Sequence, residues 1–128
     1  MDRSIEIKSV GNILIATVVG ELDESAYLAM RDQVRASLEK TGAQHILLDL
    51  RRCVMRVFLA EVFKVAASNV EVIPPAAKYA VVYSAHTLPE ADVQFGELVA
   101  RNRGAQLRAF TDLIEAQAWL SAPAVVSD

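Results

Sequence analysis

The stretch Tyr79-Ala80-Val81-Val82-Tyr83 has the composition of a buried strand, and it decides how the rest of the chain is interpreted. A helix is predicted to begin at Thr87, and a second strand follows at Gln106-Leu107-Arg108-Ala109-Phe110. A short helix then begins at Thr111-Asp112 and reaches Ala118-Trp119-Leu120. Because strands that alternate with helices form right-handed crossovers, this region predicts a parallel α/β sheet.

The N-terminal residues predict a hairpin at one edge of that sheet. Ile5–Val10 alternates apolar and polar side chains, as a half-buried strand does, and Gly11-Asn12 is a two-residue turn signal. Ile13–Val19 is a more continuously apolar strand, which Gly20 is expected to end. We therefore expect the first strand to be an antiparallel edge.

Two helices and a central strand are predicted between the hairpin and the stretch quoted above. Asp23 is a suitable N-cap for the first helix, and Thr41-Gly42 ends it. His45–Leu50 is a short apolar strand of the kind found at the centre of parallel sheets. Val54–Ala67 is predicted to form the second helix.

The last two helices carry sequence signals at their starts. Thr87 and Glu90 have the spacing of a capping box, with Pro89 in the first turn. Asp112 and Glu115 repeat the capping-box spacing before the final helix.

The complete order is β-β-α-β-α-β-α-β-α. It predicts an α/β fold with a mostly parallel five-stranded sheet, an antiparallel N-terminal edge strand and helices packed against the sheet. We expect residues 1–122 to form a single domain and residues 123–128 to form a C-terminal tail. Trp119 is expected to anchor the last helix to the sheet.

The bulk properties exclude several classes of function. The chain has 128 residues and a net charge of −3, which argues against a nucleic-acid partner, since phosphate binding needs a basic face. The single cysteine cannot form an internal disulfide, and with two separated histidines it does not make a metal site. We expect a cytoplasmic protein without a signal peptide, a membrane span, a metal or a cofactor.

The apolar face of the predicted helix Val54–Ala67 is wider than a helix needs to cover a sheet. One explanation is that the helix contacts both the sheet and a neighbouring helix. The alternative is that part of this face meets a second protomer or another protein. The candidate interface residues are Phe58, Leu59, Val62 and Phe63.

Three stretches of the chain carry a family resemblance. They are Ile13–Asp23, with Gly20-Glu21-Leu22-Asp23 after an apolar strand, Ile46–Leu50, and Gly104–Asp112 leading to Ala116–Leu120. These stretches resemble the SpoIIAA-like family of small bacterial proteins, whose fold is related to STAS and lipid-binding SEC14 domains. The resemblance covers about the whole chain. It implies a STAS-like fold, as in anti-anti-sigma factors, and a non-enzymatic module that acts through contact with other proteins.

The chain departs from that resemblance at one functional position. Anti-anti-sigma factors carry a phosphorylatable serine at the start of the helix after the Asp-Leu strand. Here the region from Asp49 to Phe58 contains no Ser, Thr or Gly. Because a phosphoryl switch needs a hydroxyl acceptor, partner switching by phosphorylation at that position is not expected.

Ligands of open parallel sheets bind beyond the carboxyl ends of the strands, so residues at those ends are candidates. Arg51, Arg52 and Arg56 form the densest positive patch, and guanidinium groups bind carboxylates and phosphates well. The alternative is a solvated loop with surface ion pairs. Cys53 could be a low-pKa thiol beside these arginines and a helix N-terminus, or a small core residue.

Ser84, His86 and Thr87 form the next candidate group, at the end of the quoted strand. A serine and a histidine two residues apart could suggest a nucleophile and a base, but no glycine-flanked nucleophile elbow surrounds Ser84. The alternative is that Thr87 caps a helix and His86 is a loop residue.

Taken together, the residues and the resemblance predict a non-enzymatic STAS-like regulatory or protein-interaction module that forms a homodimer or binds a protein partner. The alternative is a small-molecule or lipid-binding carrier, with an apolar or anionic ligand at the carboxyl ends of the strands.

Overall fold

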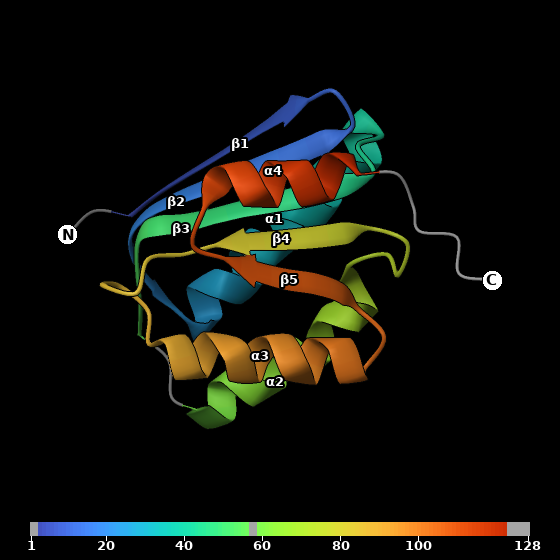
Figure 1. Cartoon of the computed structure of the whole chain (residues 1–128). Coiled ribbons are helices and arrows are strands. Elements are labelled where there is room, and N and C mark those ends of the chain that lie inside the picture. The colour runs from blue at the N-terminus through green and yellow to red at the C-terminus, as the bar shows by residue number, and fades with distance from the viewer. Residues whose placement is uncertain (1–2, 57–58, 123–128) are drawn as a thin grey trace.

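The computed structural model describes residues 3–56 and 59–122, without the side chains of residues 59, 60, 62 and 70. Within these residues, five strands and four helices follow one another in the predicted order (Figure 1). Their bounds are β1 Ser4–Val10, β2 Ile13–Asp23, α1 Glu24–Thr41, β3 His45–Arg56, α2 Leu59–Val72, β4 Lys78–Val82, α3 Glu90–Asn102, β5 Gln106–Phe110 and α4 Leu113–Ser121. The predicted tail at 123–128 lies outside the described residues.

The strands form one sheet in the order β1-β2-β3-β4-β5, so each strand lies beside its neighbour in the sequence. β1 is antiparallel to β2, and the other three pairs are parallel. Because successive right-handed crossovers run in one direction, α1, α2 and α3 cover the same face of the sheet. α4 covers the opposite face over β3, β4 and β5 (Figure 1). This arrangement confirms the predicted α/β fold with an antiparallel edge strand.

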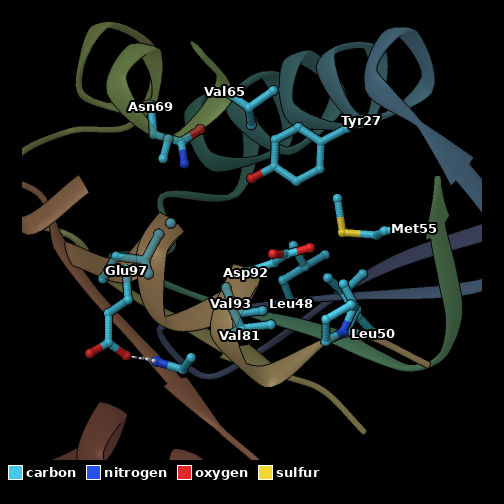
Figure 2. Close-up of a pocket in the computed structure, with 16 residues that line it drawn as sticks. Tyr27, Leu48, Leu50, Met55, Val65, Asn69, Val81, Asp92, Val93 and Glu97 are labelled. Carbon is cyan, nitrogen blue, oxygen red and sulfur yellow. Dashed lines mark hydrogen bonds between the residues drawn. The ribbon is translucent and has the colours of Figure 1, made fainter. Parts of the chain in front are cut away.

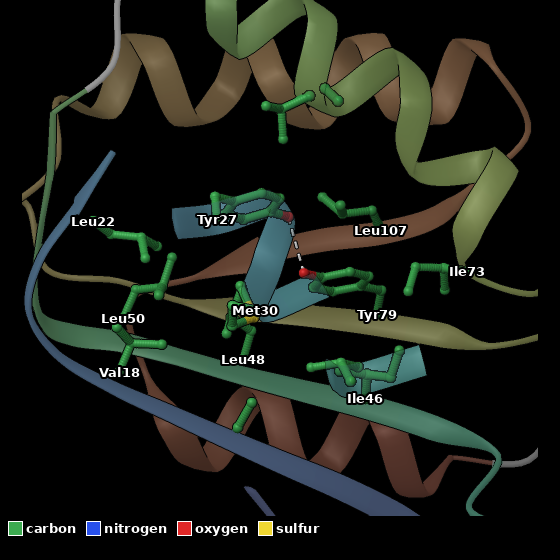
Figure 3. Close-up of a cluster of buried hydrophobic side chains, with 14 of the residues drawn as sticks. Val18, Leu22, Tyr27, Met30, Ile46, Leu48, Leu50, Ile73, Tyr79 and Leu107 are labelled. Atoms are coloured by element: carbon green, nitrogen blue, oxygen red, sulfur yellow. Dashed lines mark hydrogen bonds between the residues drawn. The ribbon is translucent and has the colours of Figure 1, made fainter. Parts of the chain in front are cut away.

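Each face of the sheet has its own apolar core. On the face covered by three helices, Met30 and Leu48 belong to one buried cluster, which also contains a hydrogen bond of 3.0 Å between the hydroxyls of Tyr27 and Tyr79 (Figure 3). On the other face, the ring of Trp119 lies 5.8 Å from that of Phe110. This contact confirms that Trp119 anchors α4 to the sheet.

Helix ends predicted from capping residues are confirmed in three places. The Asp23 carboxylate accepts a hydrogen bond of 2.8 Å from the backbone N–H of Ala26 at the start of α1. Gly42 follows α1 with φ 74°, a conformation that favours glycine. Asp112 caps α4 by accepting a hydrogen bond of 2.7 Å from the backbone N–H of Ile114.

β2 and β3 are both longer than the sequence suggested. β2 does not end at Gly20, whose φ of 105° is accommodated inside the strand, and β3 continues to Arg56. The parallel ladder pairs Glu21 with Val54 and Leu22 with Met55, so these residues form strand hydrogen bonds. The prediction of a helix beginning at Val54 was therefore wrong, and α2 is shifted toward the C-terminus.

The start of α3 also differs from the prediction. α3 begins at Glu90, and Pro89 in an extended conformation is its N-cap, without a side-chain hydrogen bond. Thr87 does not cap the helix, because its hydroxyl donates to the backbone carbonyl of Ser84 at 3.1 Å. The capping-box spacing of Thr87 and Glu90 is thus coincidental, and the threonine instead closes the turn that follows β4.

A buried arginine joins α1 to α2. Arg31 is 7% exposed, and its Nη1 donates to the Ser68 hydroxyl at 2.8 Å, the Asn69 side-chain oxygen at 2.9 Å and the Val65 carbonyl at 3.4 Å. Its Nε is buried without a hydrogen-bond partner, and no carboxylate pairs with it among the residues that the structure describes. Because a buried charge needs compensation, these α2 acceptors are essential to its stability.

We expect the substitution Arg31→Ala to lower the free energy of unfolding by about 3 kcal/mol, since it leaves buried acceptors without a donor. Arg31→Met keeps an apolar side chain of similar length and should cost less than Arg31→Ala. Urea unfolding followed by circular dichroism measures both values.

Arg35 on the same helix is a matched control. Its exposed side chain forms an i,i+4 ion pair of 3.5 Å with Glu39, so Arg35→Ala should cost below about 0.5 kcal/mol. If Arg31→Ala is as mild as Arg35→Ala, Arg31 does not hold α1 and α2 together.

Candidate functional site

An apolar cavity of about 170 Å³ lies between the sheet and the helices α2 and α3 (Figure 2). Its floor comes from β3, β4 and β5, and its walls come from the helices on that face. The residues that line it are Tyr27, Leu48, Leu50, Met55, Val65, Ala66, Asn69, Val81, Leu88, Pro89, Asp92, Val93, Gly96, Glu97, Leu107 and Ala109.

Small residues on three different elements account for this space. Ala66 on α2, Gly96 on α3 and Ala109 on β5 all line the cavity. A larger side chain at any of these positions would occupy volume that is now empty, because protein interiors otherwise pack closely. The cavity therefore results from the meeting of short side chains that are far apart in the sequence.

Four polar side chains stand among the apolar ones, and Figure 2 shows them on two opposite sides. Asn69 and Tyr27 lie on the side of α1 and α2, and Asp92 and Glu97 lie on α3. The Tyr27 hydroxyl is bonded to Tyr79, and the Asn69 side-chain oxygen accepts from Arg31. These contacts fix the wall on the α1 and α2 side.

The wall formed by α3 is negatively charged. The Glu97 carboxylate accepts a hydrogen bond of 2.7 Å from the backbone N–H of Ala109, which ties α3 to β5. Burial raises the pKa of Tyr83, and the negative charges of Glu90 and Glu97 raise it further. The carboxylates of Glu90 and Glu97 therefore act on Tyr83 in the same direction as its burial.

None of the seven site residues predicted from the sequence lines the cavity. They are Arg51, Arg52, Cys53, Arg56, Ser84, His86 and Thr87. The structure does bring Ser84, His86 and Thr87 close to one end of it, because their loop leads directly into Leu88 and Pro89. Their role as ligand-binding or partner-binding residues stays a prediction.

Cys53 is a core residue and not a reactive thiol. It lies inside β3, fully buried, and no helix begins beside it. Burial raises the pKa of the Cys53 thiol to about 11, although the charge of Arg3 acts in the opposite direction. The interpretation as a low-pKa thiol was wrong because the predicted helix N-terminus is in fact a strand.

The three arginines of the predicted patch lie on β3. Arg52 and Arg56 alternate with Cys53 and Met55, so they lie on the face of the strand opposite the cavity. Arg56 pairs with Glu21 at 2.9 Å, and Arg51 pairs with Asp49 at 2.8 Å. Arg52 has no ion-pair partner within residues 3–56 and 59–122.

The pKa of Asp49 reflects its ion pair with Arg51. Partial burial acts to raise the pKa of Asp49, but hydrogen bonds from the side chain and backbone of Arg51 outweigh it and lower the pKa. Two arginines of the patch are thus already neutralised by carboxylates, as the surface ion-pair interpretation implies. Their capacity to attract an anion is reduced accordingly.

Ser84 and His86 are not arranged as a nucleophile and a base. The Ser84 hydroxyl accepts a hydrogen bond of 3.2 Å from the backbone N–H of His86, and no contact with the imidazole ring is found in the described part of the chain. The His86 side chain is exposed. The geometry that activates a serine, a hydroxyl bonded to an imidazole nitrogen, is therefore not formed there.

The predicted interface residues can be located only in part. Phe58 lies outside the described residues, as do the side chains of Leu59 and Val62. Phe63 is 42% exposed, with its ring 6.4 Å from that of Phe95 on α3. Phe63, Phe95 and the exposed Leu98 form an apolar surface that we call the α2–α3 patch.

The described residues contain no group of three or more His, Cys, Asp or Glu side chains placed to bind a metal ion. No helix within them is long and apolar enough to cross a membrane.

The fold is the one found in solved anti-sigma factor antagonists. A solved anti-sigma factor antagonist from Mycobacterium paratuberculosis is similar with a TM-score of 0.68 at 13% identity, over 94% of this chain and 96% of that one. SpoIIAA, an anti-sigma factor antagonist in its unphosphorylated form, matches with a TM-score of 0.54 at 16% identity, over 91% and 94% of the two chains.

The sequence itself shows the family to which the chain belongs. The model of the SpoIIAA-like family matches residues 13–121, and the chain belongs to this family. An uncharacterised protein with a SpoIIAA-like fold from Shewanella loihica has a TM-score of 0.54 at 18% identity, over 92% of this chain and 93% of that one. No curated protein matches the sequence.

The burial of Cys53 can be tested by the reactivity of its thiol. At pH 8 we expect the native protein to react with Ellman's reagent at least about 100-fold more slowly than the unfolded protein. The raised pKa lowers the fraction of thiolate, and burial keeps the reagent away from the sulfur. A control with Cys53→Ala and Ala85→Cys places the thiol in the exposed loop after β4 and should react rapidly. Rates within tenfold for native and unfolded protein would contradict the core assignment.

Proposed function

We propose that this chain is a non-enzymatic regulatory module that acts through protein–protein contact and associates with a second copy of itself. The observation that carries the proposal is the α2–α3 patch. Membership of the SpoIIAA-like family and a fold shared with anti-sigma factor antagonists support it.

The α2–α3 patch combines exposed apolar side chains with two aromatic rings. Leu98 is 57% exposed, and its neighbour Phe95 contacts the exposed ring of Phe63. The Arg103 guanidinium lies 6.0 Å from the centre of the Phe63 ring. Exposed aromatic groups with an adjacent arginine are typical of residues that dominate binding at protein interfaces.

A second copy is the occupant that we favour. Most soluble homo-oligomers are two-fold dimers in which the same patch of both subunits meets. An apolar patch is complementary to a second copy of itself, because no oppositely charged groups have to face each other across the contact. A two-fold contact would bring Phe63 and Leu98 of both subunits together and remove them from water.

The proposed regulation does not use a phosphoryl switch at the usual position. No serine or threonine occurs between Thr41 and Ser68. Ser68 is in the middle of α2 and is half-buried, where its hydroxyl donates to the Val65 carbonyl and accepts from Arg31. Phosphorylation of Ser68 would have to break the contact between α1 and α2. A phosphoryl switch instead requires a hydroxyl that is accessible at the protein surface.

The dimer is tested by the substitution Phe63→Asp, which places a charge in the centre of the patch. We expect wild-type protein to show the mass of a dimer in light scattering, and Phe63→Asp to show that of a monomer with unchanged circular dichroism. Because an exposed ring is removed, the free energy of unfolding of the monomer should change little.

Ile114→Asp is the matched control. Ile114 is 76% exposed on α4, on the opposite face of the sheet, so the same change of chemistry there should leave the dimer intact. Wild-type protein that remains monomeric at high concentration would refute self-association. Unfolding of Phe63→Asp would show that Phe63 belongs to the core.

A second candidate function is the binding of a small molecule, which the cavity of about 170 Å³ favours. Pockets for drug-sized ligands occupy roughly 300–1,000 Å³, so a lipid chain is too large to be enclosed. The cavity also lies beneath α2 and α3 and not beside the arginines of β3. We therefore propose a compact ligand in place of the lipid or anion suggested by the sequence.

A further inference from the structure

The cavity contains two polar groups that no protein atom uses. They are the side-chain nitrogen of Asn69 and the carboxylate of Asp92, for which no hydrogen bond or ion pair is found in the described part of the chain. The other two polar lining residues, Tyr27 and Glu97, are bonded to Tyr79 and to the backbone of β5. A ligand would find one donor and one anion in an otherwise apolar space.

The orientation of the Asn69 amide follows from its partner. Arg31 has only donors, so the atom of Asn69 that lies 2.9 Å from Arg31 Nη1 must be the oxygen. The amide nitrogen then lies on the other branch of the side chain, and Figure 2 shows it on the cavity side. Asn69 is 2% exposed, and its N–H₂ group has no hydrogen bond to the described residues, so it can donate to a ligand.

The charge on the cavity wall selects against anions. Its negatively charged lining residues are Asp92 and Glu97, and among the described residues no Lys, Arg or His lines it. Arg31 lies behind Asn69, outside the lining, and its hydrogen bonds are used by α2. Glu97 is already paired with Arg101 at 3.5 Å, so the unpaired charge on this wall is that of Asp92. A carboxylate or phosphate would be repelled by Asp92, whereas a cation would gain a partner in it.

The volume limits the apolar part of the ligand. An engineered apolar cavity of roughly 150 Å³ binds benzene, and this cavity is slightly larger at about 170 Å³. One six-membered ring with a short side chain fills such a space. Leu48, Val81 and Val93 provide the apolar contacts for the ring.

We propose that the cavity binds a compact organic amine, a single ring or an aliphatic group of that size carrying a protonated amine. The amine pairs with the Asp92 carboxylate, and the Asn69 amide donates to an oxygen of the ligand where it has one. This inference rests on the second candidate function, and it names the ligand class that the geometry selects.

The test compares three probes that share a phenyl ring and a two-carbon chain: 2-phenylethylamine, 2-phenylethanol and 3-phenylpropionate. Binding is followed by the methyl signals of Leu48, Val81 and Val93 in two-dimensional NMR at pH 7. We expect the amine to bind at least about tenfold more tightly than the carboxylate, with the alcohol between them.

Two substitutions on α3 locate the charge effect. Asp92→Asn should weaken the amine about tenfold, to the level of the alcohol, and leave the alcohol unchanged. Glu90→Gln is the matched control, because Glu90 is exposed in the first turn of the same helix and does not line the cavity. It should change the affinity for the amine by less than about threefold.

The experiment distinguishes two questions: whether the cavity binds a ligand at all, and whether it prefers an amine. Ala66→Leu fills the cavity and should abolish binding of all three probes while the protein stays folded by circular dichroism. Absence of binding by any probe up to about 10 mM would overturn both the inference and the second candidate function. Equal binding of the amine and the carboxylate would overturn the inference alone, as would amine binding that survives Asp92→Asn.

Discussion

The parallel ladder between β2 and β3 is the constraint on which the rest of the structure depends. It runs from Ile13 and His45 to Asp23 and Arg56, with one irregularity after Thr17. Since a shift of one residue would exchange the two faces of a strand, this register decides which side chains enter the core. It directs Met55 into the cavity and leaves Arg52 and Arg56 on the opposite face.

The helices α2 and α3 depend on that ladder and on a small number of polar contacts. Arg31 ties α2 to α1, and Glu97 ties α3 to the backbone of β5. Between these attachments the two helices present short side chains to the sheet, including Ala66 and Gly96, and the cavity remains. The polar contacts thus hold the helices in place where apolar packing alone does not fill the space.

The sequence predicted those features that local chemistry determines. The caps at Asp23 and Asp112 and the glycine after α1 follow from backbone hydrogen bonding within a few residues. The extension of β3 could not be predicted, because an apolar run such as Val54–Met55 suits a strand or a helix until its partner strand is known. The cavity could not be predicted either, because Ala66, Gly96 and Ala109 lie on different elements and line one space only after folding.

The two proposed activities share one pair of helices. Val93 lines the cavity on the inner side of α3, and Phe95, two residues later, belongs to the α2–α3 patch. Successive residues of a helix point about 100° apart, so a short helix can serve both surfaces. α3 is held to β5 through Glu97 and packs against α2. A movement of α3 would therefore change the shape of both the cavity and the α2–α3 patch. If a ligand in the cavity displaces α3, it will also change the binding of a partner at the α2–α3 patch, and the reverse holds equally.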